Sequence, residues 1–104
     1  MNRLKAQVKY QEGVSVIHLA GYLSTEAASV VEESFQQAAD AGKILLAFQE
    51  ETYLNSAGLV MLFDLIMPWL SRGKQFRIVH PSKHFRRVLQ IMGLNRYAEI
   101  FEAE

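Results

Sequence analysis

The chain contains no cysteine among its 104 residues. This absence excludes disulfide bonds, cysteine nucleophiles and zinc sites built on thiolates. An excess of charge of either sign is also absent, because eleven basic residues balance eleven acidic ones. The chain therefore has no overall electrostatic attraction to nucleic acid or to an anionic membrane.

Secretion signals and long apolar runs are missing as well. The first five residues are too polar for the apolar core of a signal peptide. The most apolar stretch, residues 59–67, is interrupted by Asp64. We therefore expect a cytoplasmic protein without membrane insertion. Its length suits one domain, residues 1–104, with a single hydrophobic core.

Motifs for catalysis and metal binding are not found either. The sequence has no glycine-rich phosphate loop and no nucleophile elbow. His80 and His84 have the spacing of two ligands on one helix, but Pro81 and Ser82 place His80 before that helix begins. His18 stands alone within a strand, where a structural role is far more common than metal binding. We therefore expect no enzyme activity, no metal and no cofactor.

The N-terminal part of the chain has the period of β-strands. Apolar residues at positions 4, 6, 8 and 10 alternate with polar ones, as in a strand with one solvent-exposed face. Gln11, Glu12 and Gly13 predict a turn, and residues 14–20 predict a second strand, antiparallel to the first. The apolar run 44–48 predicts a strand buried on both faces.

The segment after Gly21 predicts the first long helix. Ser24 is the predicted N-cap, and apolar residues at positions 28, 31, 35 and either 38 or 39 fall on one side. Glutamates and glutamines at 32, 33, 36 and 37 fall on the other side, where we expect them to be solvated. Gly42 is predicted to end this helix.

A second helix is predicted to begin at about Ala57, because positions 59, 62, 63, 66 and 70 are apolar. This spacing turns Val60, Met61 and Asp64 outward. Pro68 lies within the apparent span and removes a backbone hydrogen bond. We therefore expect the helix to break just before Pro68, with a kink as the alternative.

The remaining chain completes an α/β pattern. Residues 76–79 predict a strand, and strand, helix and strand in this order form a right-handed crossover between parallel strands. Ser82 is the predicted cap of a last helix that ends at Gly93, and residues 97–101 predict a short helix or an edge strand. The whole predicts a mixed sheet of four to five strands with an N-terminal hairpin and about four flanking helices.

The candidate functional site precedes the second helix. Asn55 and Ser56 are both residue types that cap helices. Because the free amides of a helix N-terminus favour anions, the hydroxyl of Ser56 is well placed to carry a phosphate. We expect Gly58 to leave room for a kinase to approach, and Val60 and Met61 to form an apolar docking patch beside Ser56.

Several segments share their order and spacing with a known family. Residues 48–59, 73–82 and 85–94, together with Gly21-Tyr22-Leu23, resemble a STAS domain and most closely the bacterial anti-sigma factor antagonists. The resemblance covers nearly the whole chain and implies a mixed sheet flanked by helices. It also implies partner switching: the unphosphorylated protein sequesters an anti-sigma factor kinase of the GHKL type and frees the sigma factor, and phosphorylation releases the kinase. Ser56 matches the phosphoacceptor serine.

The sequence departs from the family at four positions: Ser24, Ala47 and Asn55 stand where the family usually has Asp, and Ala57 stands where it often has a second Ser or Thr. Asn55 can cap a helix as well as Asp, but it cannot take a proton or carry a charge. We therefore expect slow or absent phosphorylation of Ser56, restored by Asn55→Asp. The expected partner-binding residues are Ser24, Asn55, Ser56, Ala57, Gly58, Val60, Met61 and Asp64.

Two other functions stay open. Small accessory subunits of lipid-transport ATPases also resemble STAS domains, and Ser56-Ala57-Gly58-Leu59 matches the sequence they carry at this site. The other function is a non-phosphorylated scaffold or a module that senses a nucleotide or a lipid. Purification with partners distinguishes the three, because each names a different binding partner: a kinase, a transporter ATPase, or a small molecule.

Overall fold

The computed structural model describes residues 3–49, 52–79 and 83–91. Four strands in these ranges form a mixed sheet in the order β1-β2-β4-β6. β1 (Lys5–Gln11) and β2 (Val14–Ala20) form the predicted antiparallel hairpin. β4 (Lys43–Phe48) pairs parallel with β2, and β6 (Gln75–Val79) pairs parallel with β4. The predicted mixed sheet is confirmed.

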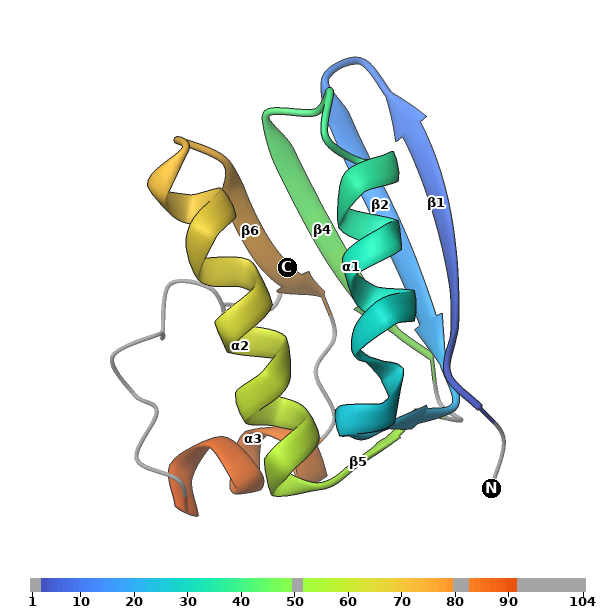
Figure 1. Cartoon of the computed structure of the whole chain (residues 1–104), viewed down its shortest axis with the longest axis vertical. Coiled ribbons are helices and arrows are strands. Elements are labelled where there is room, and N and C mark those ends of the chain that lie inside the picture. Colours follow the sequence, from blue (N-terminus) through green and yellow to red (C-terminus); the bar gives the residue numbers. More distant parts are fainter. Residues whose placement is uncertain (1–2, 50–51, 80–82, 92–104) are drawn as a thin grey trace.

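A second, very short sheet joins two distant parts of the chain. β3 (Tyr22–Leu23) pairs in parallel with β5 (Tyr53–Leu54), at the end of the main sheet where α2 begins (Figure 1). A strand of two residues is too short to show alternation, so the sequence did not predict this pairing. The pairing places the start of α2 beside the segment that follows β3.

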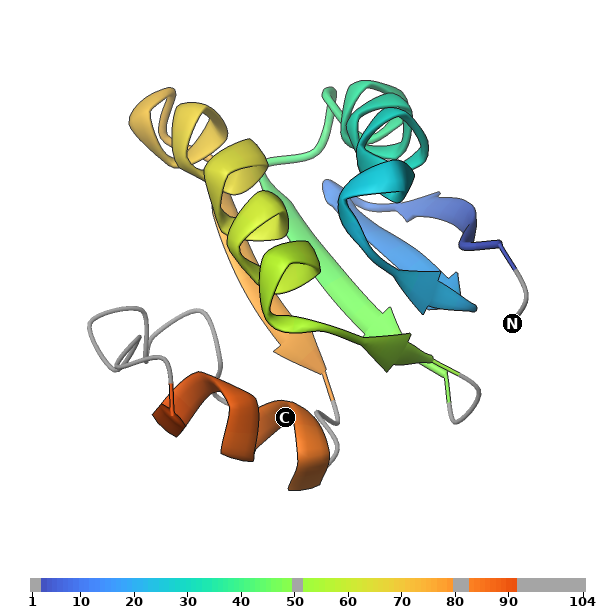
Figure 2. The same cartoon turned by 60° about the horizontal axis from the view of Figure 1, so that its bottom comes forward.

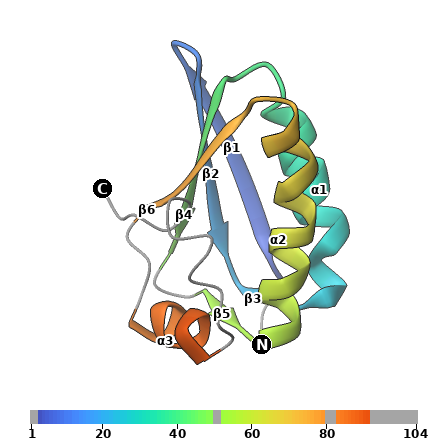
Figure 3. The same ribbon diagram turned by 90° about the vertical axis from the view of Figure 1, so that its left-hand side faces the viewer.

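Helices cover one face of the main sheet. The 3-10 helix η1 (Thr25–Ala27) leads into α1 (Ala28–Gln37), and α2 (Ser56–Ser71) joins β4 and β5 to β6. α1 and α2 lie together on one side of the sheet (Figure 3). α3 (Lys83–Ile91) lies at the end of the sheet where α2 begins (Figures 1 and 2).

The hydrophobic core lies between the sheet and α1 and α2. Ile44 and Leu46 of β4 face this core and are fully buried, whereas the alternate residues Leu45 and Ala47 are only half-buried. The prediction that 44–48 is buried on both faces is therefore wrong, because α1 and α2 both lie on the same face. Phe85 anchors α3, since it is buried and its ring centroid lies 5.0 Å from that of Phe48.

The first long helix ends earlier than predicted. α1 ends at Gln37 instead of Gly42, because the amide of Gly42 donates to the carbonyl of Gly13 at 3.0 Å and is drawn toward the β1–β2 turn. Beyond the helix, the ammonium of Lys74 donates to the carbonyls of Ala39 at 2.6 Å and Ala41 at 2.8 Å. Tertiary hydrogen bonds thus replace helical ones.

The predicted break in the second helix is also wrong. α2 is continuous over Ser56–Ser71 with Pro68 inside it. Pro68 removes the donor to the carbonyl of Asp64. Both residues are exposed, so a water molecule can donate to the carbonyl of Asp64 in place of the lost amide, and the helix continues at little cost.

The predictions for His80, Ser82 and Gly93, and for the apolar residues between 92 and 101, lie outside the described residues. Within the described ranges, none of the helices combines the length and the hydropathy that a membrane crossing requires.

Candidate functional site

Asn55 is the N-cap of α2, as predicted. Its backbone is extended, with φ −115° and ψ 171°, and its Oδ1 accepts a hydrogen bond from the amide of Gly58 at 2.7 Å. Ser56 is the first residue of the helix instead of a cap. The amide of Leu59 makes the first intrahelical bond, to the carbonyl of Asn55 at 3.1 Å. The amides of Ser56 and Ala57 therefore remain available to an anion.

The amide group of Asn55 has a second partner that the sequence did not reveal. Its Nδ2 donates to the hydroxyl of Tyr22 in β3 at 2.9 Å. An asparagine can accept at the cap and donate to a tyrosine at once, whereas an aspartate can only accept. The sequence contains one signal for such a partner: an asparagine that caps a helix through its oxygen still has an amide nitrogen that can donate.

Ser56 and Ala57 are both exposed at the start of α2. In the described part of the chain no hydrogen bond holds the hydroxyl of Ser56. A hydroxyl that is exposed and free of partners is sterically accessible to a kinase.

Positions 56, 60, 64 and 67 of α2 lie on one side of the helix, because they are spaced by four, four and three residues. All four residues are exposed, with Val60 at 41% and Met67 at 40% of the possible area. The outward prediction is confirmed for Val60 and Asp64. We call this set, Ser56, Val60, Asp64 and Met67, the α2 face; it extends over about 16 Å.

Met61 does not belong to the α2 face. It is half-buried and packs against the hydrophobic core, so the prediction that it faces outward is wrong. Met61 follows Gly58 by three residues and lies on the side of α2 that Gly58 brings against the rest of the chain. An exposed aromatic residue that the sequence did not single out lies nearby: Tyr53 of β5 is 59% exposed and precedes the cap by two residues.

Gly58 is buried, and its role differs from the predicted one. A Cβ atom at Gly58 would overlap the carbonyl oxygen of Leu23 and lie 2.9 Å from the Cα of Ser24. The expectation that Gly58 leaves room for a kinase is wrong, because the chain's own backbone occupies that room. Glycine is needed here so that α2 can approach the end of β3.

Ser24 lies at the start of η1 and is half-buried. Its side chain makes no capping hydrogen bond, so the predicted cap is not formed. The amide of Ala27 donates instead to the backbone carbonyl of Ser24 at 2.9 Å, which closes the 3-10 turn. The contact with Gly58 nevertheless brings Ser24 close to the first turn of α2.

Within residues 3–49, 52–79 and 83–91, no three His, Cys, Asp or Glu side chains gather in a way that could hold a metal ion. His18 lies on β2, where its Nδ1 is 3.1 Å from the Nε2 of Gln49.

The described residues form a small α/β domain with a mixed sheet and two helices on one face of it. Its candidate site is the exposed Ser56 at the capped start of α2. A family model described as "Mlab, STAS domain" matches residues 6–102. The chain therefore belongs to the STAS domain family, as the sequence motifs predicted. A search of curated proteins finds no match.

Solved structures of anti-sigma factor antagonists have the same fold. SpoIIAA in its unphosphorylated form has a TM-score of 0.71 at 19% identity, over 95% of this chain and 87% of that chain. An antagonist from Mycobacterium paratuberculosis has a TM-score of 0.70 at 22% identity, over 89% and 80%. Bacillus SpoIIAA in its phosphorylated form has a TM-score of 0.66 at 18% identity, over 95% and 90%.

Proposed function

We propose that this protein is an anti-sigma factor antagonist that acts in the cytoplasm by partner switching with an anti-sigma factor kinase of the GHKL type, and so regulates transcription. The observation that supports this proposal is the exposed hydroxyl of Ser56 at the end of the α2 face, which forms no hydrogen bond with the residues that the structure describes. Val60 and Met67 on this face expose apolar area that a partner would cover.

Phosphorylation of Ser56 would act by charge. A phosphate adds about −1.5 to −2 charges at neutral pH. The free amides of Ser56 and Ala57 would stabilise it in the unbound protein. A docked partner would instead have to desolvate the phosphate. The carboxylate of Asp64 on the same face is also negative, so the partner would cover two like charges together. The phosphorylated protein would therefore release its partner.

Asn55 would limit the rate at which Ser56 is phosphorylated. Its Oδ1 accepts from Gly58 and its Nδ2 donates to Tyr22, so the side chain is held in place. An amide oxygen is not basic enough to take the proton of Ser56. We expect slow or absent phosphorylation, and faster phosphorylation of the Asn55→Asp variant by the same kinase.

A binding titration with the kinase tests the proposal. We expect Ser56→Glu to weaken binding at least tenfold, while Gln36→Glu, which adds the same charge at an exposed position of α1, leaves the affinity unchanged. Mass spectrometry after incubation with kinase and ATP measures phosphate on Ser56 in the native chain and in Asn55→Asp. Rapid, complete modification of the native chain would contradict the role given to Asn55.

A second candidate function is that of an accessory subunit of a lipid-transport ATPase. The observation that favours it is that no carboxylate follows β5 at the cap, where Asn55 is held by two hydrogen bonds. The α2 face would then dock on the ATPase without phosphorylation. Co-purification with a transporter ATPase, and no phosphate on Ser56 in native chain or Asn55→Asp, would favour this function over partner switching.

A further inference from the structure

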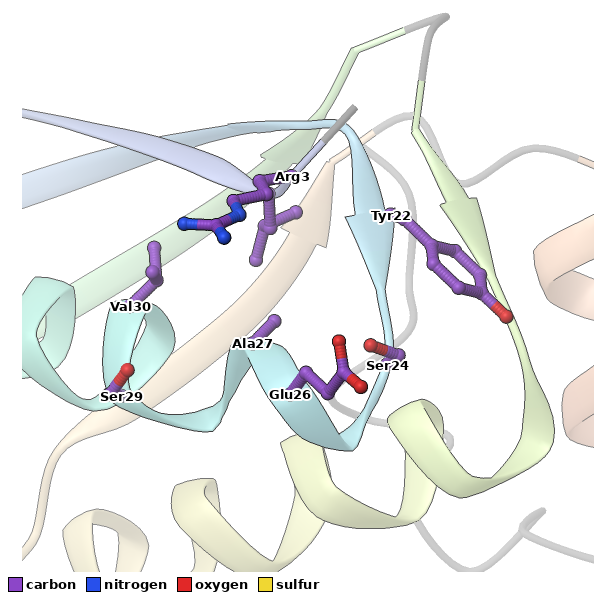
Figure 4. Close-up of a pocket in the computed structure, with 8 residues that line it drawn as sticks. Arg3, Tyr22, Ser24, Glu26, Ala27, Ser29 and Val30 are labelled. Atoms are coloured by element: carbon purple, nitrogen blue, oxygen red, sulfur yellow. The ribbon is translucent and has the colours of Figure 1, made fainter. Parts of the chain in front are cut away.

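A cavity of about 390 Å³ lies beside β3, η1 and the start of α1 (Figure 4). Its apolar wall includes the buried residues Leu4 and Ala27. The polar residues that line it are Arg3, Tyr22, Ser24, Glu26 and Ser29.

Two opposite charges face this cavity without neutralising each other. Arg3 and Glu26 are both exposed, and neither forms an ion pair with any residue that the structure describes. Figure 4 shows the guanidinium of Arg3 at the end near Val30 and the carboxylate of Glu26 at the end near Ser24. The hydroxyl of Ser24 makes no capping bond and is free to take part. The cavity therefore offers a cation at one end and an anion at the other.

The openness of the charged walls favours a protein partner over a small molecule. Sites for small molecules bury about 70–90% of the ligand, whereas Arg3 and Glu26 both stand in solvent. Charged groups around a protein interface lie in this way at its solvent-accessible rim. We therefore expect the cavity to be occupied by part of a protein surface.

The cavity lies beside the start of α2, the end of the helix that carries Ser56. Tyr22 lines the cavity, and its hydroxyl accepts the hydrogen bond from Asn55, the residue that begins α2. Ser24 lines the cavity as well, and its Cα lies beside Gly58 in the first turn of α2. A partner that covers Ser56 would thus also reach this cavity.

We propose that the cavity receives two oppositely charged side chains of the partner that docks on the α2 face, an acidic one at Arg3 and a basic one at Glu26. This inference rests on the proposed function. The guanidinium of Arg3 can bind a carboxylate through two parallel hydrogen bonds. The carboxylate of Glu26 and the hydroxyl of Ser24 both accept from a basic group.

Such a pair sets orientation and selectivity. Complementary charges at the edge of an interface mainly change the association rate and the choice of partner. The apolar side chains of the α2 face attract without direction. Arg3 and Glu26 would therefore fix which way round the partner lies over Ser56, and reject partners with the opposite charge order.

Binding of the kinase to neutral variants tests this inference. Arg3→Gln and Glu26→Gln are each expected to weaken binding about five- to tenfold, mainly through a slower association and with a smaller dependence on salt. The matched controls are Lys9→Gln on β1 and Glu33→Gln on α1, which remove the same charges from exposed positions outside the cavity. All four variants should have the melting temperature of the native chain.

The outcomes separate the inference from the proposed function. If Val60→Asp abolishes binding while Arg3→Gln and Glu26→Gln bind like the native chain, the inference is overturned and the proposed function stands. Equal weakening in the cavity variants and the two controls would indicate a general effect of charge and would also overturn it. If the native chain does not bind the kinase, both fall.

Discussion

The backbone of Gly58 in α2 packs directly against the carbonyl group of Leu23 in β3, and the carbonyl carbon would lie 2.7 Å from a Cβ atom at position 58. Residues 35 positions apart therefore fix the start of α2, and with it the position of Ser56. The short β3–β5 sheet supports the same contact, because Leu23 pairs with Leu54. The site is built by the approach of two backbones.

Gly58→Ala should strongly destabilise the fold. The new methyl group would overlap the backbone of Leu23, and overpacking of this kind costs about 1–3 kcal/mol. Urea unfolding gives the free energy. Gly42→Ala is the control, because nothing lies within 4 Å of a Cβ there and its φ is not positive; it should change stability by less than about 1 kcal/mol. Equal stabilities of the two variants would contradict the contact.

Asn55→Ala should lower the free energy of unfolding by about 1 kcal/mol, because it removes the cap of α2. Asn55→Asp keeps an acceptor for the amide of Gly58 and adds a charge that the helix N-terminus favours. It should therefore be as stable as the native chain, with the hydroxyl of Tyr22 now donating. Chemical denaturation of both measures this. Equal losses would mean that the hydrogen bond to Gly58 is not what stabilises the helix start.

Val60→Asp should lose partner binding and keep its stability, whereas Met61→Asp should lose stability. Val60 is exposed, so the change should alter stability by less than about 0.5 kcal/mol while abolishing partner binding. Met61 packs against the core, so a carboxylate there should cost about 1–3 kcal/mol. Melting curves and a kinase titration are measured on both. Native affinity of Val60→Asp would exclude the α2 face as the docking surface.

Lys74→Met should destabilise the protein by about 1.5–3 kcal/mol, because it removes charged hydrogen bonds to the carbonyls of Ala39 and Ala41. These carbonyls follow the C-terminus of α1, where a cation is also favoured by the helix dipole. The control is Lys9→Met at an exposed position of β1. Urea unfolding of both variants decides, and a similar midpoint for the two would contradict the role of Lys74.

Ser15→Ala should leave stability unchanged or raise it by up to about 1 kcal/mol. Ser15 on β2 is fully buried, and its hydroxyl has no hydrogen-bond partner among the residues described. Thr52→Val is the contrast, since the hydroxyl of Thr52 donates to the carbonyl of Leu19 at 2.7 Å; it should cost about 1 kcal/mol. A larger loss for Ser15→Ala than for Thr52→Val would show that Ser15 has a partner in solution.

Much of the candidate site could be predicted because its elements are local. The capping preference of Asn55 and the helical spacing after it are properties of a few consecutive residues. The same spacing predicted Val60 and Asp64 outward and was wrong for Met61, because a single helix does not reveal how wide its buried side is. That width depends on what packs against α2 at Gly58.

The class of fold follows from local patterns in the sequence: alternation predicts the hairpin, apolar runs predict the inner strands, and helical spacing predicts α1 and α2. These signals are periodic, so they need no knowledge of distant residues. Long-range contacts in the folded chain set the β3–β5 pairing, the hydrogen bond from Asn55 to Tyr22, the early end of α1 and the cavity between Arg3 and Glu26. Each of these joins segments far apart in the chain through one or two contacts, and such contacts leave no period in the sequence.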